Sequence, residues 1–152
     1  MIRKNAWKSY TDSQKQELNT INEKYKACLN AGKTERECVK LAVKMLEEKG
    51  YQSLETYKTA NNKLKTGDKI YAVCMGKSIA AFQIGKEPLE NGMNILGAHI
   101  DSPRIDVKQN PLYENEELAY LDTHYYGGIK KYQWVTLPLA LHGVVAKKME
   151  QL

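Results

Sequence analysis

The sequence predicts a mixed α/β fold, because helical and β-strand patterns follow one another along a single chain of 152 residues. Two amphipathic segments with helical spacing come first, and a hairpin-like pair of β-prone runs follows. A short apolar run then leads to a histidine and an aspartate two residues apart, and short β-prone pieces with glycines complete the chain. Amphipathic helices must cover an apolar surface, so we expect a mixed sheet with flanking helices.

The two helices are predicted from the spacing of their apolar residues and from their caps. Residues 1–10 form an N-terminal arm with Trp7 and Tyr10 as aromatic anchors, and Thr11 or Asp12 caps the first helix. The apolar stripe of this helix is Leu18, Ile21, Tyr25, Cys28 and Leu29. The second helix begins with the capping box of Thr34 and Glu37 and ends before Gly50. Its stripe is Cys38, Leu41, Ala42, Met45 and Leu46.

Residues 51–68 are polar and rich in lysine, which predicts a connector without a regular period. Residues 69–75 and 78–84 are β-prone runs around a Gly-Lys pair and predict a hairpin. Residues 85–92 contain a proline and an Asn-Gly pair, which predicts a turn. We expect this turn to lead into a buried strand at residues 93–96.

His99 and Asp101 follow that predicted strand. In an extended chain the side chains of residues i and i+2 point the same way, roughly 6.5–7 Å apart. A carboxylate at that spacing can bond one imidazole nitrogen and leave the other free for a metal. The alternative is an ordinary histidine at a strand end with no metal. A catalytic zinc takes three protein ligands, and this pair supplies only one. The other two histidines, His124 and His142, are predicted to have structural or surface roles.

The sequence beyond Arg104 predicts a small β-rich domain that begins near residue 105. Residues 105–109 alternate like a strand with one wet face, and Asn110-Pro111 is expected to break it. Residues 114–117 predict an acidic loop, and residues 118–121, 123–128 and 135–145 are further β-prone pieces. We expect no end to this domain within the chain, because no closing strand or helix follows.

The composition excludes several classes of function. No apolar run approaches the roughly 18 residues that span a bilayer, and no hydrophobic segment follows the basic N-terminus to make a signal peptide. The net charge of +5 lies in residues 1–68, where lysines alternate with glutamates along solvated helix faces. We therefore expect a cytoplasmic protein with neither a membrane nor a nucleic-acid partner.

The three cysteines, Cys28, Cys38 and Cys74, form no CxxC pair, and their odd number argues against a closed disulfide framework. We interpret Cys28 and Cys38 as small apolar residues on helix faces.

A longer string of residues resembles a known family. Asn94-Ile-Leu-Gly-Ala-His99-Ile-Asp101-Ser-Pro-Arg104, followed by Tyr125-Tyr-Gly-Gly128 and Trp134, is similar to the M18 aminopeptidases, most closely to their bacterial, clostridial-type branch. The resemblance extends over nearly the whole chain, from the paired helices to Leu139-Ala-Leu-His-Gly-Val-Val145.

This resemblance implies a zinc-exopeptidase-like α/β domain with an inserted β-rich dimerisation domain. Residues 1–104 would be the N-terminal segment of the catalytic domain, and residues 105–152 the truncated beginning of the insertion. His99 would be a metal ligand in a two-zinc site, and Asp101 the catalytic aspartate that orients it. The full-length protein would remove N-terminal residues from peptides and assemble as a homo-oligomer, a dodecamer built from dimers. The other ligands would lie outside this chain, so we expect the chain alone to be inactive.

The sequence departs from the family pattern in two places, and two alternatives stay open. Ile100 replaces a threonine that is frequent between the histidine and the aspartate, with little expected effect. Val135-Thr-Leu-Pro138 stands where eukaryotic relatives carry aspartates, so a preference for acidic N-terminal residues is not transferred. Arg104 would attract an acidic side chain of a substrate, although a structural or surface role is favoured.

The alternatives are a non-catalytic assembly module with a peptidase-like scaffold and a two-zinc exopeptidase of the M42 or M20 type.

Overall fold

A computed structural model describes residues 5–147. The fold is mixed α/β, as the sequence predicts, and it divides into two compact units, Met1–Ala98 and His99–Leu152. The first unit combines helices with a three-stranded sheet, and the second is a two-stranded hairpin with a short helix. The division falls between Ala98 and His99, a few residues before the boundary that we placed after Arg104. Whether these units are a catalytic segment and an insertion stays a prediction.

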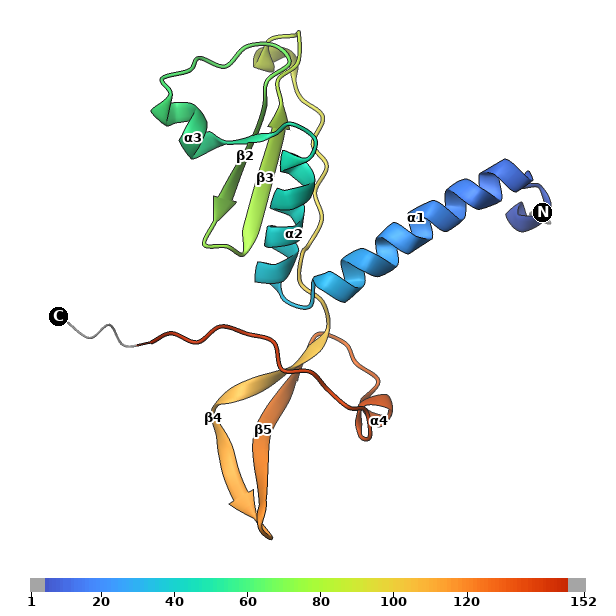
Figure 1. The fold of residues 1–152 in the computed structure, drawn as a ribbon, viewed down its shortest axis with the longest axis vertical. Helices are drawn as coiled ribbons and strands as arrows, with labels where there is room; N and C mark the ends of the chain where they lie inside the picture. The colour runs from blue at the N-terminus through green and yellow to red at the C-terminus, as the bar shows by residue number, and fades with distance from the viewer. Residues whose placement is uncertain (1–4, 148–152) are drawn as a thin grey trace, which may run out of the picture. The chain divides into compact units, whose positions relative to one another are not determined.

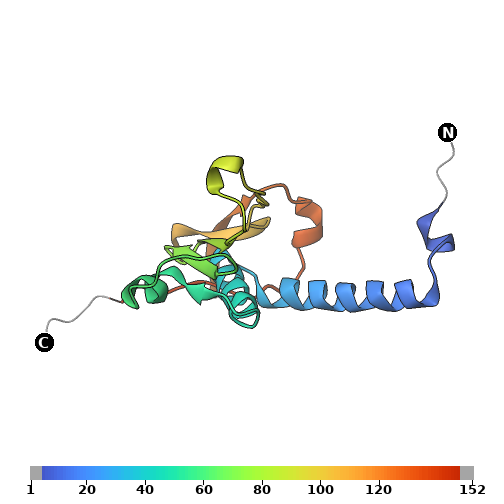
Figure 2. The same ribbon diagram turned by 90° about the horizontal axis from the view of Figure 1, so that it is seen from above.

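The helices of the first unit begin and end where the sequence predicts. A short 3-10 helix, η1 (Ala6–Lys8), precedes α1 (Asp12–Ala31), which is one unbroken helix (Figure 2). Capping boxes begin both long helices: Thr11 with Gln14 for α1, and Thr34 with Glu37 for α2 (Glu35–Glu47). Gly50 follows α2 with φ +81°, a left-handed conformation that suits glycine.

The apolar stripes of the helices are less buried than we predicted. In α2 the most buried side chain is Val39, at 3% exposure, a residue absent from the predicted stripe. Met45, which belongs to that stripe, is exposed. In α1, Ile21 and Tyr25 are also exposed. The prediction that the strands bury both stripes is therefore wrong for α1, because the helix that packs on the hairpin is α2.

The sheet of the first unit has the order β1-β2-β3. The predicted hairpin is confirmed: β2 (Lys69–Cys74) and β3 (Ser78–Gln83) pair antiparallel, and β1 (Gln52–Ser53) adds to β2 in parallel. The α2 helix runs beside the hairpin (Figure 1), and Ile70 and Tyr71 are the buried side chains of β2. The Tyr71 hydroxyl donates to Glu47 Oε1 over 2.7 Å, which ties this strand to the end of α2.

The connector at residues 51–68 is more ordered than we predicted, because it contains β1 and the short helix α3 (Leu54–Thr59). Its helix is too short to show an apolar period in the sequence, and hydrogen bonds to Asp68 hold the segment. The Tyr57 hydroxyl and the Lys65 amide both donate to Asp68 Oδ2, the amide over 2.8 Å. These bonds, led by that from Tyr57, lower the pKa of Asp68, and the same bond raises the pKa of Tyr57.

The strand predicted at residues 93–96 is not formed. After the 3-10 turn η2 (Leu89–Asn91), residues 92–103 have no regular structure, and Leu96 is fully exposed. A strand needs a neighbour to receive its backbone hydrogen bonds, and no strand within residues 5–147 pairs with this segment. His99 and Asp101 therefore lie on an extended loop instead of a strand end.

The second unit is a long hairpin of β4 (Arg104–Asn115) and β5 (Leu118–Tyr126), followed by the short helix α4 (Lys131–Trp134) (Figure 1). The predicted break at Asn110-Pro111 is wrong, because β4 continues through it. The pairing instead shifts register between Val107 and Leu112. An irregular stretch in a two-stranded sheet accommodates a proline, which cannot donate to the ladder.

The acidic loop is confined to a tight turn, and the last predicted strand is absent. Glu116 and Glu117 both have positive φ, +50° and +64°, which is the backbone of a type I′ hairpin turn. Residues 136–147 have no regular structure, although their composition is β-prone, because no described strand lies beside them to pair. No helix in the described part of the chain combines the length and apolar character that a membrane span requires.

We expect Tyr57→Phe to weaken the dependence of stability on acid. A lowered Asp68 pKa stabilises the fold above the usual aspartate range, and this contribution is lost as the pH falls through the folded-state value. Removing the Tyr57 hydroxyl removes the largest cause of that lowering, so the variant should lose less stability than the parent between about pH 6 and about pH 3. Denaturant unfolding at several pH values measures it.

Tyr51→Phe is the matched control, because its ring stays under the Lys69 ammonium, 5.6 Å from the ring centroid. An identical acid dependence in Tyr57→Phe and the parent chain would contradict this assignment.

Candidate metal centre

The loop before β4 brings the imidazole of His99 onto the carboxylate of Asp101. His99 Nδ1 lies 3.2 Å from Asp101 Oδ1 and 2.9 Å from the backbone oxygen of Asp101. This is the contact that the i, i+2 spacing predicts, although the segment is a loop and not a strand. The His99 side chain is 82% exposed and that of Asp101 36%, so the imidazole is open to ligands while the carboxylate is partly covered.

The partners of Nδ1 determine the neutral form of the His99 ring. Both oxygens beside Nδ1 are acceptors, so Nδ1 carries the proton and donates it. In the neutral imidazole the lone pair is then on Nε2. This tautomer is the one in which a metal-binding histidine donates to a carboxylate and coordinates through its other nitrogen.

The second oxygen of Asp101 is held by a residue that the sequence analysis did not assign. The Tyr126 hydroxyl, at the end of β5, donates to Asp101 Oδ2 over 2.8 Å. This bond, the backbone amide of Asp101 and the bond and charge of His99 lower the pKa of Asp101, while burial opposes them. The carboxylate is therefore ionised at neutral pH and accepts hydrogen bonds through both oxygens.

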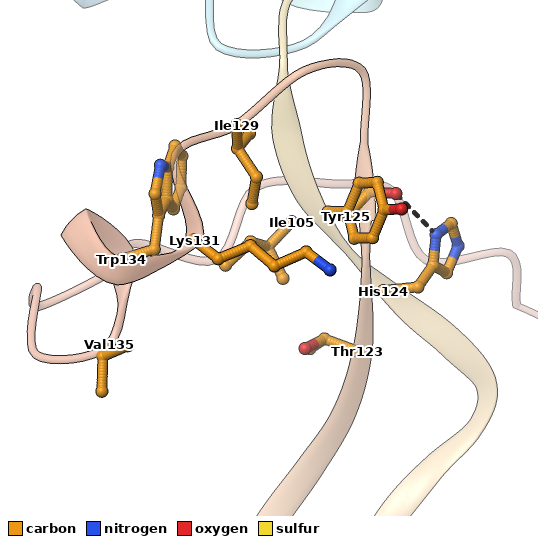
Figure 3. Close-up of a pocket in the computed structure, with 8 residues that line it drawn as sticks. All are labelled: Ile105, Thr123, His124, Tyr125, Ile129, Lys131, Trp134 and Val135. Carbon is orange, nitrogen blue, oxygen red and sulfur yellow. Dashed lines mark hydrogen bonds between the residues drawn. The ribbon is translucent and has the colours of Figure 1, made fainter.

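The other residues that the sequence singled out make contacts of their own. His124 on β5 has its Nδ1 3.2 Å from the backbone oxygen of Tyr125 and lines a hollow of about 340 Å³ beside α4 (Figure 3). Trp134 lines the same hollow, and the Lys131 ammonium lies 4.4 Å from the centroid of the Tyr125 ring. Arg104 binds Asp106, with 2.6 Å between Nε and Oδ1, which supports a structural role.

The cysteines are free thiols. Cys28 and Cys38 are half-buried on the helices, as expected of small apolar residues, and Cys74 is exposed. Burial, with the nearby Glu37 and Glu35 carboxylates, raises the pKa of Cys38. The raised pKa favours a protonated, unreactive Cys38 thiol over a metal ligand.

Comparison with known proteins decides the family. Residues 28–151 match the family described as "Aminopeptidase I zinc metalloprotease (M18)". The chain belongs to the M18 family. Among curated M18 proteins, it is 57% identical over 145 residues to "Probable M18 family aminopeptidase 1" of Clostridium acetobutylicum, covering 95% of this chain and 31% of that protein. The M42 or M20 alternative is thereby excluded, and the clostridial resemblance is confirmed.

Solved M18 structures share the fold. The crystal structure of aminopeptidase I from Borrelia burgdorferi is 41% identical, with a TM-score of 0.81 over 89% of this chain and 32% of that one. Aminopeptidase I from Clostridium acetobutylicum is 53% identical, with a TM-score of 0.68 over 91% of this chain and 31% of that one. The M18 chain described here thus spans about a third of the length of its relatives.

The residues present fit a zinc ion in part. His99 offers one imidazole nitrogen, already oriented by a carboxylate, which is the donor that zinc prefers together with thiolates and carboxylates. Within residues 5–147, however, no group of three or more His, Cys, Asp or Glu side chains is placed to hold a metal. This M18 chain therefore supplies one candidate ligand and its orienting carboxylate.

We expect Asp101→Ala to change the tautomer of His99 in the metal-free chain. Nδ1 has two acceptors, and the backbone oxygen of residue 101, 2.9 Å away, remains in the variant. Removal of the charged acceptor Oδ1 should therefore move the neutral ring part of the way toward the Nε2-protonated form. Long-range ¹⁵N–¹H correlation spectra, recorded above the imidazole pKa, distinguish the two forms. His124, whose Nδ1 lies 3.2 Å from the backbone oxygen of Tyr125, serves as an internal control. A His99 spectrum that Asp101→Ala leaves unchanged would contradict a role of the carboxylate in setting the tautomer.

Proposed function

We propose that this chain is the N-terminal portion of a zinc-dependent aminopeptidase in which His99 is a metal ligand and Asp101 the catalytic aspartate that orients it. The observation that carries the proposal is the donation from His99 Nδ1 to Asp101, which leaves Nε2 available on an exposed ring. Membership of a zinc metalloprotease family supports it. The comparisons do not favour the alternative of a non-catalytic assembly module.

The substrate class follows from the family. Zinc lowers the pKa of a bound water and polarises a carbonyl group, which is the chemistry that peptide hydrolysis requires. The role of this chain is to hold one imidazole in the correct orientation and tautomer. We infer that the complete protein binds two zinc ions and removes the N-terminal residue of peptides.

The wider architecture is also a proposal. Residues 1–104 would form the first segment of the catalytic domain and residues 105–152 the beginning of an inserted dimerisation domain. Large apolar side chains are exposed in both units, including Tyr25, Leu96, Leu112 and Val145. Exposed apolar surface of this kind is typical of a surface that packs against further protein. From the family resemblance we infer a homo-oligomer, a dodecamer built from dimers, located in the cytoplasm.

We expect His99→Ala in the complete protein to lose one zinc equivalent and most of the activity. Asp101→Asn should retain the metal but lose activity by at least about tenfold, because an amide orients and polarises the imidazole less well than a carboxylate. Metal analysis and the hydrolysis of aminoacyl anilides measure the two effects separately. His124→Ala is the control and should keep both zinc and activity. Full turnover in Asp101→Asn would exclude the assigned role.

We expect residues 1–152 alone to be inactive, because one imidazole cannot make the three-ligand site that a catalytic zinc requires. The purified chain should neither retain zinc through gel filtration nor hydrolyse aminoacyl anilides. Hydrolysis by this chain that a chelator abolishes would show that the site is complete within it.

A further inference from the structure

The contacts of Asp101 bring a third residue to the candidate site. One oxygen, Oδ1, faces His99 Nδ1 at 3.2 Å, and the other, Oδ2, accepts from the Tyr126 hydroxyl at 2.8 Å. A carboxylate with a single partner can turn about its terminal bond, whereas one held at both oxygens has one orientation. Tyr126 thus fixes which oxygen Asp101 presents to the imidazole.

Tyr126 is itself held by the opposite strand. It pairs directly with Arg104 across the β4–β5 ladder, and the Arg104 guanidinium lies 4.3 Å from the centroid of the Tyr126 ring. Arg104 is anchored in turn by Asp106, its neighbour on the same face of β4. The aromatic ring is therefore stacked against a guanidinium that an ion pair already orients, which limits the movement of the hydroxyl.

The end of β5 also fits closely against the loop that carries Asp101. Gly127 has φ +72°, and a Cβ atom placed there would lie 3.4 Å from the Cα, Cβ and Cγ atoms of Pro103. A side chain at this position would be strained and would push against the proline. The absence of a side chain at Gly127 therefore permits the close approach of Pro103, and the bond from Tyr126 to Asp101 links the loop to β5.

We propose that Tyr126 is a positioning residue that acts on the metal centre through Asp101. The inference rests on the proposed function, since it assumes that His99 binds zinc. The hydroxyl does not touch the metal. It orients the Asp101 carboxylate, which in turn orients the His99 ring. The Tyr-Gly-Gly segment and the His-x-Asp-Ser-Pro segment, more than twenty residues apart in the sequence, thus belong to one structure.

The test is Tyr126→Phe in the complete protein. Phenylalanine keeps the ring against Arg104 and removes only the hydroxyl, so the fold is expected to be retained. Outer partners of metal ligands change affinity or activity by about 10–100-fold. We therefore expect about a tenfold weaker affinity for the zinc that His99→Ala loses, measured by competition with a chromogenic chelator. The same variant should lower kcat by about tenfold with KM little changed.

Tyr125→Phe is the matched control, because it makes the same chemical change on the opposite face of β5 and should leave zinc affinity and kcat as they are. In an Asp101→Asn background, Tyr126→Phe should have little further effect, since it acts through that carboxylate. Parent-like zinc affinity in Tyr126→Phe, with His99→Ala and Asp101→Asn impaired, would overturn the positioning role and leave the proposed function standing. Full zinc retention in His99→Ala would overturn both.

Discussion

The ionised carboxylate of Asp101 is the group on which the candidate site depends. Oδ2 accepts from Tyr126 and joins the His99–Pro103 loop to the end of β5, while Oδ1 lies beside His99 within the loop. Hydrogen bonds to a charged acceptor are stronger than those between neutral groups. The loop has no regular structure of its own, and the bond from Tyr126, with the close approach of Pro103 to Gly127, links it to the end of β5.

The β4–β5 hairpin has a local role in addition to any part in assembly. Its first residue, Arg104, follows directly after the Ser-Pro pair, and its last residue, Tyr126, pairs with Arg104 across the ladder. The two ends of the hairpin therefore meet beside the loop that carries His99. A long two-stranded hairpin of this kind brings distant residues of the sequence together at its open end. Its turn, at Glu116 and Glu117, lies at the other end of the ladder.

The sequence predicted local features well and long-range ones poorly. The capping box of Thr34 follows from spacing within a few residues, as does the contact of His99 with Asp101. The expected strand at residues 93–96 did not form, because a strand depends on a neighbour that no local pattern reveals. Val39 was missed because helical spacing identifies an apolar face but not the part of it that packs deepest. The bond between Tyr126 and Asp101 spans 25 residues and left no signal beyond the Tyr-Gly-Gly motif.

The central claim is that His99 coordinates zinc through Nε2 while Asp101 holds Nδ1. Zinc-anomalous diffraction from crystals of the complete protein tests it most directly. We predict an anomalous peak about 2.0–2.1 Å from His99 Nε2, with Asp101 Oδ1 still within hydrogen-bond distance of Nδ1. A zinc peak remote from His99, or one coordinated by Nδ1, would contradict the account.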